Sequence, residues 1–233
     1  MSLPNGEILS DAGLNLQAVF DIEDLPNEIN DVLHLQCDDF PSLTQLLLIG
    51  HGGPTLWENI ERSGFHSDDP VDDYTVETIS RYFDEYLPGH AMHFVYPSPA
   101  PIGLRDLGML AGWHHNSPFR VGVNSEWGPW FAYRAVVLTD TDFDITPTIE
   151  AASPCVKCPD KPCITACPAG ALLGGDLNLD KCVEFRILED SPCEDTCLAR
   201  ESCPVGSEHR YSDAQIYYHY GRSMDTIRNW KRN

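Results

Sequence analysis

The sequence predicts an α+β protein with two parts, an N-terminal α+β domain over residues 1–150 and a C-terminal cysteine-rich module over residues 151–233. Three observations predict this division. Strand-like and helix-like stretches interleave without an internal repeat through residue 150. Eight of the nine cysteines then fall between Cys155 and Cys203, and the charge balance changes near the same point. The two parts are therefore expected to differ in chemistry as well as in fold.

Charge is unevenly distributed along the chain. Residues 1–150 carry five arginines, no lysine and 24 acidic residues, whereas residues 151–233 carry ten basic and twelve acidic residues. Affinity for nucleic acid comes largely from neutralisation of phosphates by Lys and Arg, so we expect no nucleic-acid partner. The acidic residues are expected to form a solvated surface rather than a docking face.

No membrane or export segment is expected. The N-terminus, MSLPNGEILSDAG, has neither the basic region nor the apolar region of a signal peptide. The longest apolar run, around residues 46–49, is too short to span a bilayer. We therefore expect a cytoplasmic protein without a membrane partner, and the sequence predicts no oligomeric state.

The elements of the N-terminal domain follow from local patterns. Residues 42–49, SLTQLLLI, predict a buried strand, Gly50–Gly53 a turn, and a helix is expected to begin near Pro54. A second helix is expected over residues 69–87, with Pro70 in its first turn and apolar residues at helical spacing. The remaining expected elements are a strand over 91–96, a loop over 97–101, a helix over 104–111, strands over 119–123 and 131–139, a linker over 141–153 and a helix over 213–230.

The clustered cysteines form two groups, each followed by a proline. The first group is Cys155, Cys158, Cys163 and Cys167, and the second is Cys182, Cys193, Cys197 and Cys203. Thiolates are the ligands of iron–sulfur clusters, and in the bacterial ferredoxin run the fourth cysteine, before a proline, ligates the other cluster. The sequence therefore predicts two [4Fe–4S] clusters with crossed ligands. We assign the first cluster to Cys155, Cys158, Cys163 and Cys203, and the second to Cys182, Cys193, Cys197 and Cys167.

Zinc and disulfide bonds are the alternative interpretations of these cysteines. Tetrahedral zinc accepts four cysteines, and Cys193 with Cys197 could form half of such a site. Disulfides suit an oxidising compartment, which this sequence does not indicate. The two Cys-Pro pairs favour clusters over zinc, and zinc over disulfides. Basic side chains among the ligands would offset the charge of anionic clusters: Lys157, Lys161, Lys181, Arg186 and Arg200. The ninth cysteine, Cys37, is expected to be a small buried apolar residue.

The stretch LRDLGMLAGWHHNSPFRVGVNSEWGPWFAYRAVVLTD, residues 104–140, resembles the cobalamin-dependent iron–sulfur reductases, especially epoxyqueuosine reductase. The segment LLLIGHGGPTLW is similar to cobalamin-processing proteins of the cobalamin C type, whose fold resembles that of flavin nitroreductases. The resemblance implies a nitroreductase-like N-terminal domain, a ferredoxin-like module with two [4Fe–4S] clusters, and cobalamin or FMN as a further cofactor. It also implies that Gly112, Trp113 and His114 bind that cofactor.

The chain also departs from the epoxyqueuosine reductases. Their aspartate proton donor should fall near Tyr96 or Pro97, where this chain reads Val95-Tyr96-Pro97-Ser98. The basic tRNA-binding surface and the helical C-terminal extension are missing. The resemblance therefore implies the architecture and leaves the substrate open.

Other candidate motifs in the N-terminal domain have simpler interpretations. Gly50–Gly53 could approach a phosphate through backbone N–H groups, but no complete phosphate-binding motif is present, so a turn is favoured. The histidine pairs His90 with His93 and His114 with His115 lack a supporting carboxylate or cysteine and are not expected to bind metal. The aromatic side chains of residues 127–133 are expected in the core. The sequence names no catalytic residue.

These observations predict an iron–sulfur redox protein. Electrons would pass through two [4Fe–4S] clusters to cobalamin or a flavin in an N-terminal cleft, with a redox partner protein or a small-molecule substrate. The alternative is a ferredoxin-type electron carrier whose N-terminal domain docks a partner and performs no catalysis. The sequence leaves open whether the protein is an enzyme.

Overall fold

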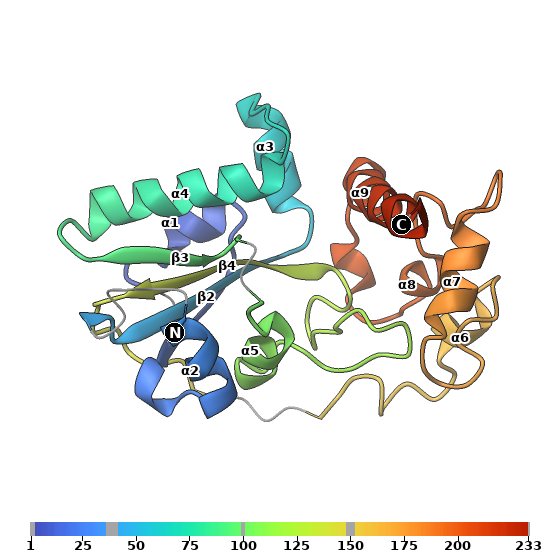
Figure 1. Ribbon diagram of the computed structural model, residues 1–233, viewed down its shortest axis with the longest axis horizontal. Helices are drawn as coiled ribbons and strands as arrows, with labels where there is room; N and C mark the ends of the chain where they lie inside the picture. The colour runs from blue at the N-terminus through green and yellow to red at the C-terminus, as the bar shows by residue number, and fades with distance from the viewer. Residues whose placement is uncertain (1–2, 36–41, 99–100, 148–151, 233) are drawn as a thin grey trace. The chain divides into compact units, whose positions relative to one another are not determined.

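The protein folds into two compact units (Figure 1). The structure is a computed structural model that describes residues 3–35, 42–98, 101–147 and 152–232. The first unit is Met1–Gly112 with Ala132–Glu150, and the second is Trp113–Phe131 with Ala151–Asn233. The sequence predicts a single boundary at residue 150. In the structure, residues 113–131 also belong to the cysteine-rich unit, so the chain crosses between the units more than once.

A four-stranded antiparallel sheet forms the centre of the first unit, in the order β1-β2-β4-β3. β1 (Leu16–Asp21) pairs with β2 (Gln45–Gly52), and β3 (Met92–Tyr96) pairs with β4 (Phe131–Thr139). The Thr44 N–H donates to the Thr139 carbonyl at 2.9 Å, so the start of β2 lies beside the end of β4. Every residue of β2 is buried, as expected for a central strand with an apolar run.

Helices cover both faces of this sheet. α1 (Gly6–Asp11) and α4 (Pro70–Tyr86) lie on one face, and α2 (Asn27–His34) and α5 (Leu104–Leu110) lie on the other (Figure 1). α3 (Thr55–Ser63) follows β2, and a short 3-10 helix spans Ile22–Asp24. α4 confirms the predicted helix: it carries proline in its first turn and buries an apolar stripe that includes Ile79 and Phe83.

The strand predicted over residues 42–49 is present, but its end and the predicted turn are wrong. β2 continues through Gly50 and His51 to Gly52, and Gly50 pairs with Leu16. The Asn15 amide extends this pairing because its Oδ1 accepts from the Gly52 N–H at 2.7 Å and its Nδ2 donates to the Gly52 carbonyl at 3.0 Å. The glycine-rich segment is therefore mostly strand, and Gly53, with φ of 76°, makes the turn.

The sequence patterns did not predict α1, β1 or α2. β1 is only six residues long, and its burial does not alternate from one residue to the next. Its pairing partner β2 is almost thirty residues away in the chain, so tertiary pairing rather than local pattern defines it. Cys37 and parts of the predicted loop and linker, at residues 99–100 and 148–151, lie outside the described residues.

The second unit consists of several short helices joined by turns and one long C-terminal helix. They are α6 (Pro162–Thr165), α7 (Leu179–Arg186), α8 (Leu198–Glu201), a 3-10 helix at Ser207–His209 and α9 (Asp213–Arg232). α9 confirms the predicted C-terminal helix. Ile216 of α9 packs with Trp130 and Tyr211 in a small buried core.

Residues 113–131 join this unit through packing, and the strand predicted at 119–123 is wrong. Phe119 and Val123 form a buried cluster with Cys163, Leu172 and Ala199. Backbone pairing in this segment is limited to the isolated bridges His115–Val123 and Asn124–Gly128. The alternating apolar residues therefore anchor a loop to a core instead of forming a strand. Trp130 and Phe131, at 1% and 5% exposure, confirm the expected burial of aromatic residues here, whereas Trp127 and Tyr133 are half-buried.

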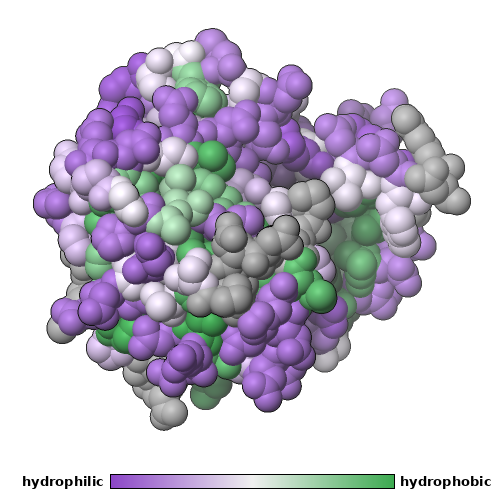
Figure 2. All heavy atoms as spheres, turned by 60° about the vertical axis from the view of Figure 1, so that its left-hand side comes forward, coloured by the Kyte–Doolittle hydropathy of each residue, from purple (hydrophilic) through white to green (hydrophobic). Residues whose placement is uncertain are grey.

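Hydrophilic residues cover most of the face of the first unit that Figure 2 turns toward the viewer, with hydrophobic residues in smaller areas between them. This agrees with the acidic composition of residues 1–150. In the part of the chain that the structure describes, no helix combines the length and apolar character needed to cross a membrane.

Candidate functional site

Four cysteines of the second unit line one cavity, which we call the first cavity. They are Cys155, Cys158, Cys163 and Cys203, the set assigned to the first cluster. Pro162 and Pro204 lie beside them in the lining. Burial raises the pKa of the Cys155, Cys163 and Cys203 thiols, and the neighbouring sulfurs of the same set raise each of these pKa values further. The four side chains are therefore electrostatic neighbours as well as members of one lining.

The other four clustered cysteines line a larger cavity of about 540 Å³, which we call the second cavity. They are Cys167, Cys182, Cys193 and Cys197, the set assigned to the second cluster. Burial raises the pKa of the Cys182 and Cys193 thiols, and Cys167 and Cys197 contribute to that rise. The fourth cysteine of each sequence group thus lies with the other group, as the crossed assignment requires.

Short helices and turns position these cysteines. Cys163 lies in α6, Cys182 in α7, and Cys197 immediately precedes α8. Asn178 caps α7 by accepting from the Lys181 N–H at 3.0 Å, which fixes the turn that carries Cys182. All eight cysteines are free thiols, so the disulfide interpretation is not supported.

The spacing of the side chains also bears on the kind of metal group. Among the described residues, no three or more His, Cys, Asp or Glu side chains meet closely enough to hold a single metal ion. A tetrahedral zinc ion needs four ligands within direct bonding distance of one centre. A four-iron cluster is wider than one ion, so its thiolates stand further apart. Neither four-cysteine set therefore forms a single-ion site in the structure.

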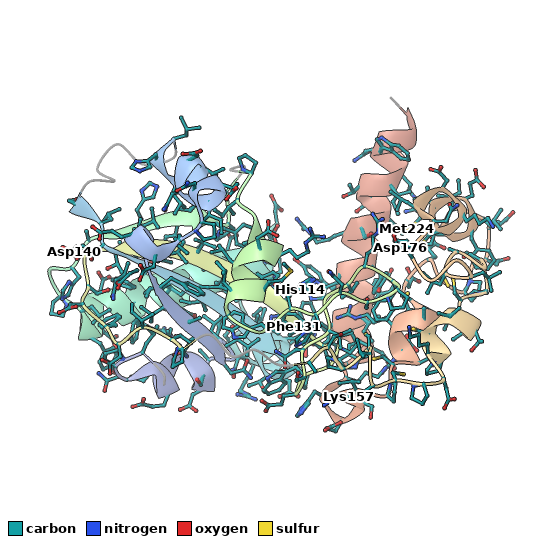
Figure 3. The ribbon with its side chains drawn as sticks, turned by 90° about the horizontal axis from the view of Figure 1, so that it is seen from below. His114, Phe131, Asp140, Lys157, Asp176 and Met224 are labelled. Carbon is teal, nitrogen blue, oxygen red and sulfur yellow. The ribbon has the colours of Figure 1, made fainter. Side chains whose placement is uncertain are left out.

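The predicted cofactor-binding residues do not lie in one unit. Gly112 follows α5 with φ of 70° and is the last residue of the first unit before the chain enters the second. Trp113 is buried, and its carbonyl accepts from the Asn124 side chain at 3.3 Å. His114 lies near Phe131 (Figure 3), and both rings border Gly122. The contacts described for Gly112, Trp113 and His114 are packing and hydrogen bonding within the chain, and they do not test whether these residues bind a cofactor.

The other predicted histidine pairs serve local roles in the structure. His90 Nδ1 lies 3.0 Å from Asp140 Oδ1, which also accepts from the Ala91 N–H. His115 Nε2 lies 3.5 Å from Ser125 Oγ. His90 and His115 therefore each make a side-chain contact of the hydrogen-bonding kind expected for these residues.

The first unit contains a polar cluster that the sequence patterns did not identify. Arg134 on β4 is 8% exposed, and its Nε donates to Nδ1 of the fully buried His51 on β2 at 2.9 Å. The same guanidinium lies 3.8 Å from Asp72 of α4. Burial raises the pKa of Tyr96 at the end of β3, while Arg134 opposes that rise. The Tyr96 hydroxyl therefore keeps its proton at neutral pH, near the position where the expected aspartate is absent.

In the second unit, the sequence patterns also did not single out Tyr220, although it lines the second cavity. Burial raises its pKa, and Cys197 raises it further, while Arg200 opposes the rise. The crowding of aromatic residues at 217–220 in a predicted helix was the available signal for this residue.

Comparison with solved structures shows which known proteins have a similar fold. No protein-family model matches the sequence, and no curated protein matches it. A selenomethionine-labelled epoxyqueuosine reductase superposes with a TM-score of 0.54 at 16% identity, over 89% of this chain and 67% of that one. An epoxyqueuosine reductase solved with an epoxyqueuosine-modified tRNA stem loop gives 0.53 at 17% identity, over 91% and 68%.

A second kind of relative matches nearly end to end. The C. elegans B12-trafficking protein CblC, a homologue of human MMACHC, gives a TM-score of 0.50 at 13% identity, over 96% of this chain and 94% of its own. The chain has the epoxyqueuosine reductase and CblC fold. This finding confirms the fold-level part of the resemblance. At these identities, the epoxyqueuosine reductase and CblC fold carries no residue roles over to this chain.

Proposed function

We propose that this protein is an iron–sulfur oxidoreductase in which two [4Fe–4S] clusters of the second unit supply electrons to a cobalamin or flavin bound by the first unit. The observation that carries the proposal is the sorting of eight free cysteines into two sets of four, each lining its own cavity. Four thiolates are the complete ligand set of one [4Fe–4S] cluster.

The chemistry of the two cavities fits such clusters. Sulfur donors and apolar side chains make up most of each lining, and an apolar shell limits water access to a redox group. The clusters would supply one-electron transfer. The chain's own residues hold the thiolates in place through the caps and turns of α6, α7 and α8. These features support the ferredoxin-like module that the sequence predicts.

The second cofactor is proposed from the fold. The structural relatives include reductases and a B12-trafficking protein, so cobalamin is the first candidate and a flavin the second. In the first unit, Tyr96 retains its proton, and the charges of Arg134 and Asp72 act on its hydroxyl. Gly112, Trp113 and His114 stay predicted cofactor-binding residues.

Spectroscopic titration tests this function. Protein purified anaerobically is titrated with cob(II)alamin and, separately, with FMN, and then reduced through its clusters. We expect a saturable spectral change with one of the two, followed by reduction of that cofactor. Reversible cluster reduction with no binding of either cofactor would overturn the proposal in favour of the electron-carrier alternative.

The substrate class needs a separate test because two observations disagree. The acidity of residues 1–150 predicts no nucleic-acid partner, whereas one structural relative was solved with a tRNA stem loop. Binding of an epoxyqueuosine-modified stem loop is compared with binding of the unmodified loop at low and at physiological salt. Binding that prefers the modified loop at both salt concentrations would make RNA the substrate. If the protein does not prefer the modified loop, a small molecule or a redox protein is the substrate or partner.

A further inference from the structure

Arg186 is a buried cation at the second cavity, with 8% exposure. It follows Cys182 by four residues, so both side chains lie on one side of α7. Its Nε donates to the Cys193 carbonyl at 2.9 Å, and its terminal nitrogens donate to Ser223 Oγ at 3.0 Å and to the Glu194 carbonyl at 3.1 Å. All of these acceptors are electrically neutral.

Arg200 is a second buried cation in the lining of the same cavity, also with 8% exposure. Its Nε and one terminal nitrogen donate to the Pro129 carbonyl at 3.2 and 2.7 Å. The guanidinium lies 4.6 Å from the ring centre of Trp130, and it hydrogen-bonds the Tyr220 hydroxyl. These partners are neutral as well.

Neither arginine has a carboxylate partner within the described part of the chain. A buried charge without a counter-charge is costly, so the cavity must supply the negative charge. The two arginines are therefore placed to favour negative charge in the second cavity.

The first cavity lacks this arrangement. Among the described residues that line it, Lys161 is the one cation, and it is exposed to solvent. Solvent screens an exposed ammonium strongly, so its effect on the cavity is small. The nearby Lys157 is also exposed. Each cavity thus has four thiols of its own, and the two cavities differ in their buried positive charge.

We propose that Arg186 and Arg200 give the second cavity the higher reduction potential, so that its cluster accepts electrons from the cluster in the first cavity. This proposal rests on the proposed function. Reduction adds one negative charge to a cluster, and a buried cation stabilises that charge. One electron leaves the first cluster, which is oxidised, and enters the second, which is reduced. An external one-electron donor, such as dithionite or a reduced redox protein, then reduces the first cluster again.

A redox titration of the cluster-loaded protein, followed by electron paramagnetic resonance, tests this assignment. We expect Arg186→Gln and Arg200→Gln each to lower the higher of the two midpoint potentials. The expected change is about tenfold in the reduction equilibrium constant, or about 59 mV for one electron. Arg186→Lys and Arg200→Lys keep the charge and should retain most of the potential. Arg120→Gln is the matched control because Arg120 is exposed and paired with Asp176 at 2.9 Å.

Serine variants of one ligand in each cavity assign the two signals. Cys182→Ser should alter the higher-potential signal and Cys158→Ser the lower-potential signal. Two loaded clusters whose midpoints do not respond to either glutamine variant would overturn this proposal alone, as would a shift confined to the lower-potential signal. If one glutamine variant fails to load clusters, the other decides the result. A wild-type protein without iron and sulfide would overturn the proposed function and this proposal together.

Discussion

Arg134 shows how a single buried charge is accommodated in the first unit. The Arg134 Nε–H donates to His51 Nδ1, so the proton of the His51 ring lies on Nε2. Asp72 lies within ion-pair distance of the same guanidinium. Because all three groups are partly or fully shielded from water, removing one takes away an interaction of the others that solvent replaces poorly.

Arg134→Met should therefore lower the free energy of unfolding by about 1–3 kcal/mol, since it leaves a buried histidine acceptor without its donor. Arg62→Met is the control, because the hydrogen bond from Arg62 to Asn59 is exposed to solvent; its effect should stay within about 0.5 kcal/mol. Urea unfolding followed by tryptophan fluorescence measures both. Equal effects of the two substitutions would show that the Arg134 contacts add no stability.

Asp176 should show a pH dependence that its ion pair causes. The hydrogen bond from Arg120 and the Leu177 N–H lower the pKa of this carboxyl from 3.8 to about 2. The folded-state pKa lies below the ordinary value, so the pair stabilises the fold above about pH 4, and this contribution is lost as the pH falls toward 2. An NMR titration of the Asp176 carboxyl should give a midpoint near 2 in the wild type and a higher midpoint in Arg120→Gln, which stays below 3.8 because the Leu177 N–H still donates to the carboxylate. Identical midpoints would contradict the ion pair.

At the scale of elements, the loop of residues 113–131 meets the turn after Cys203 at two glycines. Gly128 has φ of 57°, and a Cβ placed there would lie 1.8 Å from the Val205 carbonyl oxygen. Gly206 has φ of 62°, and a Cβ there would lie 2.4 Å from the Trp127 backbone. This approach holds the turn that follows Cys203, so the loop contributes to the first cavity.

Gly128→Ala should destabilise the second unit by about 2–4 kcal/mol, because it combines left-handed backbone strain with a clash against backbone. Gly221→Ala is the matched control: Gly221 lies within α9, and a Cβ added there would meet no atom within 4 Å. That substitution should stabilise the protein by up to about 1 kcal/mol through helix propensity. Thermal unfolding of the cluster-free protein compares the two. A neutral Gly128→Ala would contradict the close approach.

The long helices and three of the four strands were predictable from the sequence, whereas α1, α2 and β1 were not. α4 and α9 have long apolar periodicity, and α4 also carries a proline start signal, so local pattern defines them. β1 depends on a partner distant in the chain, and residues 119–123 have strand-like alternation that tertiary packing uses for a loop. A local sequence pattern does not show which distant segment a strand pairs with. This explains both the missed strand β1 and the wrongly predicted strand at 119–123.

At the scale of the whole molecule, the grouping of the cysteines was largely predictable and the surroundings of the two cavities were not. Cysteine spacing and the following prolines are local signals, and the structure brings together the same two sets of four that they suggested. The buried arginines and Tyr220 matter because of what surrounds them, and the Arg134 cluster joins β2, β4 and α4. No single segment contains that information, since each contact joins residues far apart in sequence.

The central claim is that eight thiolates bind two iron–sulfur clusters, and metal analysis of anaerobically purified protein tests it most directly. We predict about eight iron atoms and eight acid-labile sulfides per chain, with about half of both lost in a variant that lacks all four cysteines of one cavity. Zinc without sulfide, or a fully active protein whose cysteines form disulfides, would contradict the account.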